Sequence, residues 1–224
     1  MFTKYLSLWS KENLLVKAFK RTVRMLEDDR EMFESASHAL RRTNTGKLTI
    51  DVYERDKKIN KYEREVRRNV LTHLALAGKK DVVPGLSLVS VVIDVERIGD
   101  YTKNIADLAQ AHPKQLPAGK YEKRLTELEI EITERFQGFE QILIGSDVKL
   151  ARALMKAHSD INIGLDEITM AMVKYTGDEL SSSDAVALAL YSRYLKRISS
   201  HLTNIASSAV NPFPRIGYRE KQLS

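Results

Sequence analysis

Residues 95–106 read V-E-R-I-G-D-Y-T-K-N-I-A, and residues 195–206 read L-K-R-I-S-S-H-L-T-N-I-A. Five residue types recur at a constant offset of 100 positions: Arg97/Arg197, Ile98/Ile198, Asn104/Asn204, Ile105/Ile205 and Ala106/Ala206. A weaker match at an offset of 102 relates Ile59, Asn60, Glu65 and Val66 to Ile161, Asn162, Glu167 and Ile168. Self-similarity at a long, fixed offset is typical of a duplicated structural unit. We therefore expect two copies of one unit in this chain of 224 residues.

The apolar residues around these segments follow the spacing of helices. In the first part of the chain, one face is formed by residues three, four or seven positions apart: Leu15, Phe19, Val23, Leu26, Phe33, Ala36 and Leu40. Similar runs predict five further helices, over 59–77, 86–108, 125–143, 150–172 and 184–205. Ser10 is the expected N-cap of the first helix. Long helices joined by short connections favour antiparallel packing.

The predicted fold class is therefore all-α, with two tandem antiparallel three-helix bundles. Pro113 and Pro117 interrupt the helical pattern near the middle of the chain. We expect a first three-helix repeat over residues 1–112, a second over residues 118–210, and a C-terminal tail of coil over residues 211–224.

The composition excludes several classes of protein. The chain has no cysteine, so disulfides, thiolate metal centres and cysteine nucleophiles are absent. No stretch approaches the roughly 20 apolar residues that a membrane-spanning helix needs, and the first residues do not resemble a signal peptide. We therefore expect a cytoplasmic location. Glycine-rich nucleotide-binding loops are missing and the histidines are scattered, so the sequence does not predict an enzyme.

An acidic stripe is the clearest candidate for a functional site. Glu96, Asp100 and Asn104 are spaced four residues apart, which puts them on one face of the third predicted helix. Two carboxylates one turn apart repel each other unless a cation lies nearby, and oxygen donors suit hard metal ions. The alternative is neutralisation by basic residues of the second helix: Arg64, Arg67 and Arg68. Spacing alone favours this alternative over a metal ion.

The same segment resembles the signature of PhoU domains, whose third helix commonly reads D-L-E-R-I-G-D-x-x-x-N-I-A. The resemblance covers roughly residues 10–210 and includes the order of helices and the internal repeat. It implies a cytoplasmic adaptor that restrains phosphate uptake and phosphate-starvation signalling. The implied partners are a phosphate transporter subunit or a sodium–phosphate cotransporter, and a sensor histidine kinase.

The family resemblance also implies metal-binding positions. E/D-x-x-x-D motifs of PhoU proteins bind iron or zinc, and carried over by position they fall at Glu96 and Asp100, with Asp56 and Asn60 on the preceding helix. In the second repeat these positions hold other residues: Lys196, Ser200, His158 and Asn162. Because a lysine opposes a cation, we expect iron, zinc or manganese at the first repeat only.

Basic residues concentrate in the first part of the chain. Residues 1–80 hold 19 Lys and Arg against 11 Asp and Glu, whereas the rest of the chain holds 17 against 19. Such a surface attracts an acidic protein or an anionic membrane surface. The predicted partner-binding residues are Lys17, Lys20, Arg21, Arg24, Lys57, Lys61, Arg64 and Arg68. A homodimer is compatible with this composition. Two alternatives are a metal-binding bundle without a signalling role and, less favoured because acidic residues alternate with the basic ones, a nucleic-acid-binding protein.

Overall fold

The computed structural model describes residues 13–77, 79–145 and 147–220. These residues form long α-helices and short 3-10 turns, and none of them lies in a β-strand. The α-helices are α2 (Leu14–Arg42), α3 (Val52–Ala77), α4 (Val82–Ala111), α5 (Glu122–Gly145), α6 (Val148–Val173) and α7 (Ser182–Val210). The predicted all-α fold with six long helices is confirmed, and the apolar face predicted for the first helix is buried.

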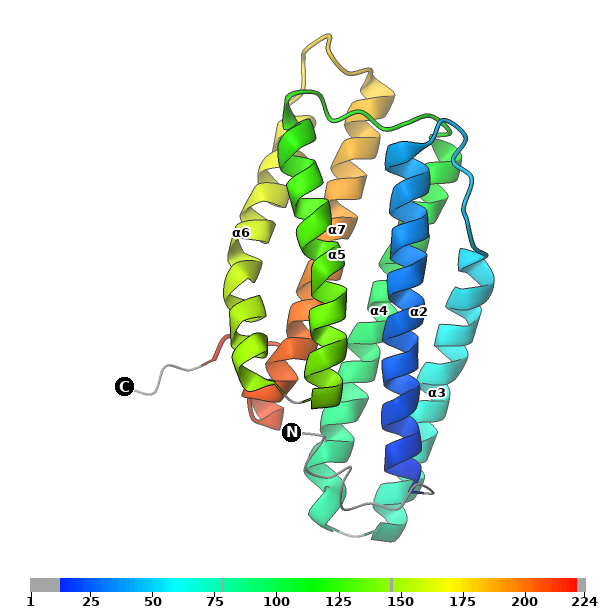
Figure 1. Ribbon diagram of the computed structural model, residues 1–224, viewed down its shortest axis with the longest axis vertical. Helices are drawn as coiled ribbons and strands as arrows, with labels where there is room; N and C mark the ends of the chain where they lie inside the picture. Colours follow the sequence, from blue (N-terminus) through cyan, green and yellow to red (C-terminus); the bar gives the residue numbers. More distant parts are fainter. Residues whose placement is uncertain (1–12, 78, 146, 221–224) are drawn as a thin grey trace.

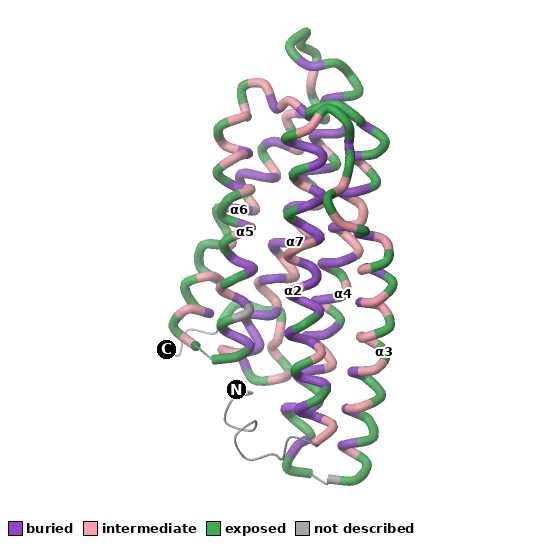
Figure 2. Tube along the Cα trace, turned by 45° about the vertical axis from the view of Figure 1, so that its right-hand side comes forward, coloured by how far each residue is buried: buried purple, intermediate pink, exposed green. Residues whose placement is uncertain are grey.

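The helices stand nearly parallel to one long axis and alternate in direction (Figure 1). In the first half, α2, α3 and α4 pack against one another, and in the second half α5, α6 and α7 do so. The two halves meet where α4 packs against α7 and α2 against α5. Buried residues line the sides of the helices that face inward (Figure 2). A single hydrophobic cluster runs through both halves, so the domain boundaries expected from the sequence stay a prediction.

A buried arginine joins the two halves at the contact between α2 and α5. Arg41 is 1% exposed, and its guanidinium donates to the Leu116 carbonyl and to the carboxylates of Glu122 and Glu129. Glu129 Oε1 lies 2.8 Å from Arg41 Nε and also accepts a hydrogen bond of 2.8 Å from the Tyr191 hydroxyl. One ion-pair network therefore ties α2, α5 and α7 together.

The helix ends follow local side-chain chemistry. Helix α2 begins at Leu14, and its N-cap is Asn13, whose side chain accepts from Leu15 N. The prediction that Ser10 caps this helix was therefore wrong. Ser10 itself lies outside the described residues. Helix α7 begins with a capping box in which Ser181 and Asp184 bond to each other's backbone N–H groups. A capping box satisfies two backbone donors that the first helical turn leaves unpaired.

The residues after α7 are more ordered than the coil expected from the sequence. A 3-10 turn over Phe213–Arg215 follows α7. The Asn211 side chain donates to the carbonyls of Arg215 and Tyr218, and Gly217 N donates to Ser207 Oγ. Glu220 then pairs with Arg152 of α6 at 2.7 Å. These contacts hold residues 211–220 against the end of the second half.

Within the described residues, none of the helices is both long enough and apolar enough to span a bilayer.

Candidate functional site

The acidic stripe predicted from the sequence lies between α3 and α4. Lys103 of α4 brings the two helices together, because its Nζ lies 2.8 Å from Asp56 Oδ2 and 3.5 Å from Asp100 Oδ1. Asn60 donates to the side chain and the backbone carbonyl of Asp56. Four of the predicted metal-site residues, Glu96, Asp100, Asp56 and Asn60, therefore gather on neighbouring faces of α3 and α4.

The counter-charges of this stripe come from α4 itself. Arg97 Nη1 lies 3.2 Å from Asp100 Oδ2, and Arg97 Nε lies 3.6 Å from Glu96 Oε2. The alternative of neutralisation by Arg64, Arg67 and Arg68 named the wrong residues: all three are exposed on α3, and Arg67 pairs with Glu63. The outward direction of their side chains explains the difference, since Arg97 and Lys103 sit one turn from the carboxylates that they neutralise.

Sequence reasoning missed the most buried carboxylate of this region. Asp29 of α2 is 0% exposed, and neither of its carboxylate oxygens has a hydrogen-bond partner. It faces α4 at Gly99, where a Cβ atom would lie 2.9 Å from Asp29 Oδ1. Gly99 thus makes room for the carboxylate. The signal was present in the sequence, because Asp29 lies between Leu26 and Phe33 at spacings of three and four, on the apolar face of the helix.

Burial and mutual repulsion both disfavour charge on this cluster. Burial raises the pKa of Asp29 well above its ordinary value, and the neighbouring carboxylates of Asp28, Asp56, Glu96 and Asp100 raise it further. Burial also raises the pKa of Glu96, with a contribution from Asp100 that Arg97 partly offsets. The adjacent Asp28 differs, because it is held by three cations: Arg24, Arg55 and Lys58. The cluster therefore favours a proton on Asp29.

The arrangement does not offer a ready metal site. Among residues 13–77, 79–145 and 147–220, there is no group of three or more His, Asp or Glu side chains placed to hold a metal ion. Oxygens of Asp56 and Asp100 are engaged by the Lys103 ammonium, which supplies the positive charge that a metal would bring. As arranged, these residues do not fit the iron, zinc or manganese expected from the sequence. Binding of a metal there stays a prediction.

The corresponding residues of the second half form a different set of contacts. Lys196 pairs with Asp166 of α6 at 2.5 Å, and Ser200 donates to the Lys196 carbonyl. His158 Nδ1 lies 3.1 Å from Ser199 Oγ, and its Nε2 lies 2.8 Å from Asn162 Nδ2. None of the four residues that replace the acidic stripe carries a carboxylate, so this half lacks the oxygen ligands of the first.

The predicted partner-binding residues lie on the outer surface of α2 and α3, but only part of them is free. Arg21 pairs with Glu65 at 2.5 Å, Arg24 pairs with Glu27 and Asp28, and Lys57 pairs with Glu54. The other five are exposed and make no ion pair within the described part of the chain: Lys17, Lys20, Lys61, Arg64 and Arg68. We call these five residues the free basic patch. All lie within about one helical turn of the Arg21–Glu65 pair, which brings their two helices side by side.

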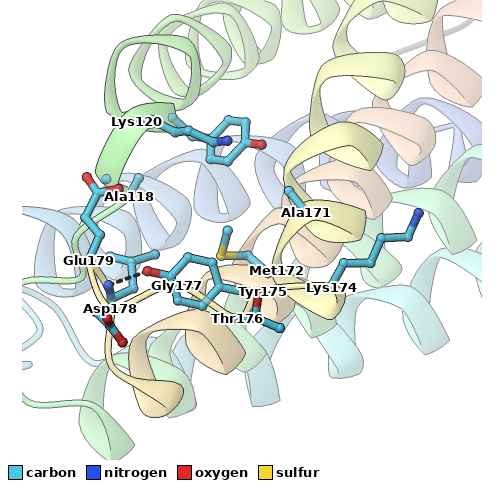
Figure 3. Close-up of a pocket in the computed structure, with 13 residues that line it drawn as sticks. Ala118, Lys120, Ala171, Met172, Lys174, Tyr175, Thr176, Gly177, Asp178 and Glu179 are labelled. Atoms are coloured by element: carbon cyan, nitrogen blue, oxygen red, sulfur yellow. Dashed lines mark hydrogen bonds between the residues drawn. The ribbon is translucent and has the colours of Figure 1, made fainter.

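A hollow of about 430 Å³ lies where α5 begins and α6 leads into α7 (Figure 3). Its lining includes Lys120, Lys174 and the ring of Tyr175, whose hydroxyl accepts a 2.7 Å hydrogen bond from Leu180 N and closes the loop. None of the residues predicted from the sequence as a metal or partner site lines it. We assign this hollow no role.

The comparisons with known proteins agree with the fold and the motif. Residues 22–109 match the PhoU domain family model. A phosphate-specific transport system accessory protein PhoU homolog from Deinococcus radiodurans is 27% identical over 164 residues, which cover 71% of this chain and 76% of that protein. The resemblance to the PhoU domain family is thereby confirmed.

Two solved structures share the fold. PhoU from Pseudomonas aeruginosa has a TM-score of 0.76 and 21% identity, over 88% of this chain and 95% of that one. The phosphate transport system regulatory protein PhoU from Streptococcus pneumoniae has a TM-score of 0.77 and 17% identity, over 88% and 93%. At these identities the two structures support the arrangement of the helices alone.

Proposed function

Because the chain carries a PhoU domain, we propose that it is an accessory regulator of phosphate transport. The observation that carries the proposal is the match of residues 22–109 to that domain, supported by the similarity to the accessory protein of Deinococcus radiodurans. In this proposal the protein works at the cytoplasmic side of the membrane and acts by binding rather than catalysis. It restrains phosphate uptake and starvation signalling through contact with a transporter subunit or a sensor kinase.

The contact surface that we propose is the free basic patch. Paired cations contribute little to long-range attraction because their partners cancel the field, whereas unpaired exposed cations attract an acidic surface. Within the set predicted from the sequence, Arg21, Arg24 and Lys57 are paired, and the five residues of the patch are not. The proposal therefore narrows the partner surface to the first half of α2 and the middle of α3.

Charge reversal tests the proposed surface. We would prepare Lys61→Glu/Arg64→Glu/Arg68→Glu and measure its binding to the purified phosphate transporter and to the phosphate-responsive kinase of the same organism. The matched control is Lys149→Glu/Lys156→Glu/Arg193→Glu, which changes the net charge equally at exposed positions of α6 and α7. We expect the first variant to lose binding and the control to keep it.

The salt dependence of binding is a second test of the proposed contact surface. Attraction between exposed charges weakens as the Debye length falls from about 10 Å at 0.1 M salt to about 3 Å at 1 M. Wild-type binding should weaken over this range. Binding that is unchanged at high salt, or lost equally in both charge-reversed variants, would contradict the proposed surface. Binding to neither the transporter nor the kinase would contradict the regulatory function itself.

A metal-binding bundle is the alternative function, and the unpartnered carboxylate of Asp29 is the observation that favours it. Elemental analysis of protein purified without chelator, for wild type and for Glu96→Ala/Asp100→Ala, measures it directly. Stoichiometric iron, zinc or manganese in the wild type and its loss in the double variant would support a metal site. The ion pairs of Lys103 lead us to expect no bound metal in either protein.

A further inference from the structure

Among the side chains that the structure describes, the second half buries an arginine whose two terminal nitrogens have no hydrogen-bond partner. Arg135 of α5 is 3% exposed, and neither terminal nitrogen of its guanidinium makes a hydrogen bond. Burial lowers the pKa of Arg135 to about 10, and Glu131, an exposed residue one turn away, offsets this only in part. A buried cation without a hydrogen-bond partner costs free energy. Its two terminal nitrogens are therefore free to donate to an anion.

Arg135 occupies the place in the second half that Asp29 occupies in the first. The buried apolar residues of α2 and α5 correspond at an offset of 106: Phe19/Leu125, Leu26/Ile132, Phe33/Phe139 and Ala36/Ile142. The same offset relates Asp29 to Arg135. Each half thus buries one unpartnered ionisable side chain at the same position of its first helix, but the sign of the charge is reversed.

The residues around Arg135 also differ in charge from those at the corresponding positions around Asp29. Helices α5 and α6 approach closely at Gly138, where a Cβ atom would lie 2.9 Å from Leu154 Cδ1. One turn along, the antiparallel direction of the two helices sets Arg135 beside His158. Lys196 of α7 takes the position of Glu96, and half-buried Ser200 takes that of Asp100. The first half thus gathers acids, and the second gathers cations and hydrogen-bond donors.

Few negative charges compensate these cations. Lys196 pairs with Asp166, whose side chain is 51% exposed to solvent. Burial, together with the positive charges of Arg135, Lys196 and Arg219, lowers the pKa of His158 to about 4. Since three cations act on one ring, this part of the molecule has a positive potential. We call Arg135, His158, Asn162, Lys196, Ser199 and Ser200 the cationic cluster.

We propose that the cationic cluster binds a phosphate group, either free inorganic phosphate or the phosphate of a small molecule or lipid headgroup. A guanidinium presents several donors in a planar fork that fits two oxygens of a tetrahedral oxyanion. Asn162, Ser199 and Ser200 add short polar side chains of the kind that donate to oxyanions, and Lys196, which pairs with Asp166, adds a second positive charge. The anion would enter between α6 and α7, beside the half-buried Asn162 and Ser200, and would supply the acceptors that Arg135 lacks.

This inference is argued from the charge and burial of the second half and does not depend on the proposed regulatory function. A protein that bound phosphate here but failed to bind the transporter or the kinase would leave the inference intact. Conversely, binding to those partners does not require the cluster, since the free basic patch lies on α2 and α3.

Calorimetry and thermal unfolding with inorganic phosphate test the proposal, with chloride at matched ionic strength and pH as the reference. We expect wild type to bind phosphate and to be stabilised by it. Arg135→Met should weaken binding at least tenfold, and Lys196→Met should weaken it by a smaller factor. Lys156→Met, an exposed lysine of α6 outside the cluster, is the matched control and should stay within twofold of wild type.

The Arg135→Met variant also separates a binding role from a structural one. Replacing an unpartnered buried charge by an apolar chain of similar length should raise the melting temperature without phosphate, while the response to phosphate disappears. Flotation with phosphatidic acid vesicles distinguishes the sources: a lipid site gives flotation that depends on Arg135 and no response to inorganic phosphate. The proposal is overturned if wild type responds to neither probe, or if Arg135→Met keeps the wild-type response.

Discussion

The close approach of α2 and α4 at Gly99 can be tested by a double-mutant cycle. In Gly99→Ala the new Cβ would lie 2.9 Å from Asp29 Oδ1, and Asp29 is fully buried. Alanine gains about 1 kcal/mol of helix propensity over glycine, whereas forcing an extra methyl group into a packed core typically costs about 1–3 kcal/mol. We therefore expect Gly99→Ala to leave stability unchanged or to lower it by up to about 2 kcal/mol.

The second half of the cycle removes the Asp29 carboxylate, which the new Cβ at position 99 would otherwise meet. In an Asp29→Ala background the carboxylate is absent, so Gly99→Ala should express its helix propensity and stabilise by up to about 1 kcal/mol. The two effects of the same substitution should then differ by about 1–3 kcal/mol. Urea unfolding followed by circular dichroism measures all four proteins. Gly145→Ala is the control, because its added Cβ would meet no atom within 4 Å beyond its chain neighbours and its own helix backbone, and it should not couple to Asp29→Ala.

Equal effects of Gly99→Ala in both backgrounds, within about 0.5 kcal/mol, would refute the reasoning. Such additivity would mean that the Asp29 carboxylate moves aside without cost. The need for glycine at position 99 would then lie elsewhere on α4.

Three further predictions concern the charged side chains of the core. Because the pKa of Asp29 is raised in the folded protein, its contribution to stability is fully present below the unfolded pKa of about 3.9 and is lost as pH rises through the folded pKa. Asp29→Asn should therefore gain stability relative to wild type as pH rises above about 4, measured by urea unfolding at each pH. His158 has the opposite sign, because its folded pKa of about 4 lies below the unfolded value of about 6.5. The free energy of unfolding should therefore fall as pH drops from about 6.5 to about 4. If His158→Gln lost stability over this range as steeply as wild type, the pH dependence would not come from His158. Arg41→Met should cost about 3–5 kcal/mol because it removes the buried cation that neutralises the largely buried Glu129, which keeps only the Tyr191 hydroxyl and Arg42 at 3.9 Å. A loss below about 1 kcal/mol in urea unfolding would show that the network does not hold the two halves together.

The helices could be predicted from the sequence because their apolar residues carry a strong period. Leu15, Phe19, Leu26, Phe33 and Leu40 were assigned to one face, and all are buried. The ends were less predictable, since a cap depends on which side chain reaches the first free N–H group. Asn13 rather than Ser10 does so at α2. The tail after Val210 is held by contacts with Ser207 and Arg152, which are distant in sequence and leave no local signal.

The candidate site was predictable only where its residues share one helix. Glu96 and Asp100 stand one turn apart, so spacing reveals them. Asp29 joins them only in three dimensions, and Lys103 gives no sequence signal of its own, because a lysine in a helix is ordinarily a surface residue. Its role depends on Asp56 of the neighbouring helix, which sequence spacing within one helix cannot show.

The two halves can carry opposite charges at the positions of Asp29 and Arg135 because the helix packing depends on the apolar positions around them. Apolar positions on α2 and α5 hold the core, so a duplicated bundle keeps them and both halves retain the same helix packing. The position of Asp29 and Arg135 lies at the same depth, yet neither side chain has a hydrogen-bond partner, so neither is required for packing. Burying such a group costs stability, and for Arg135 we propose that binding of an anion is what offsets this cost. In the first half Lys103 pairs with Asp56 and Asp100 of the acidic cluster. Among the described side chains of the second half, no carboxylate accepts a hydrogen bond from the terminal nitrogens of Arg135, and this is the half that we expect to bind a ligand.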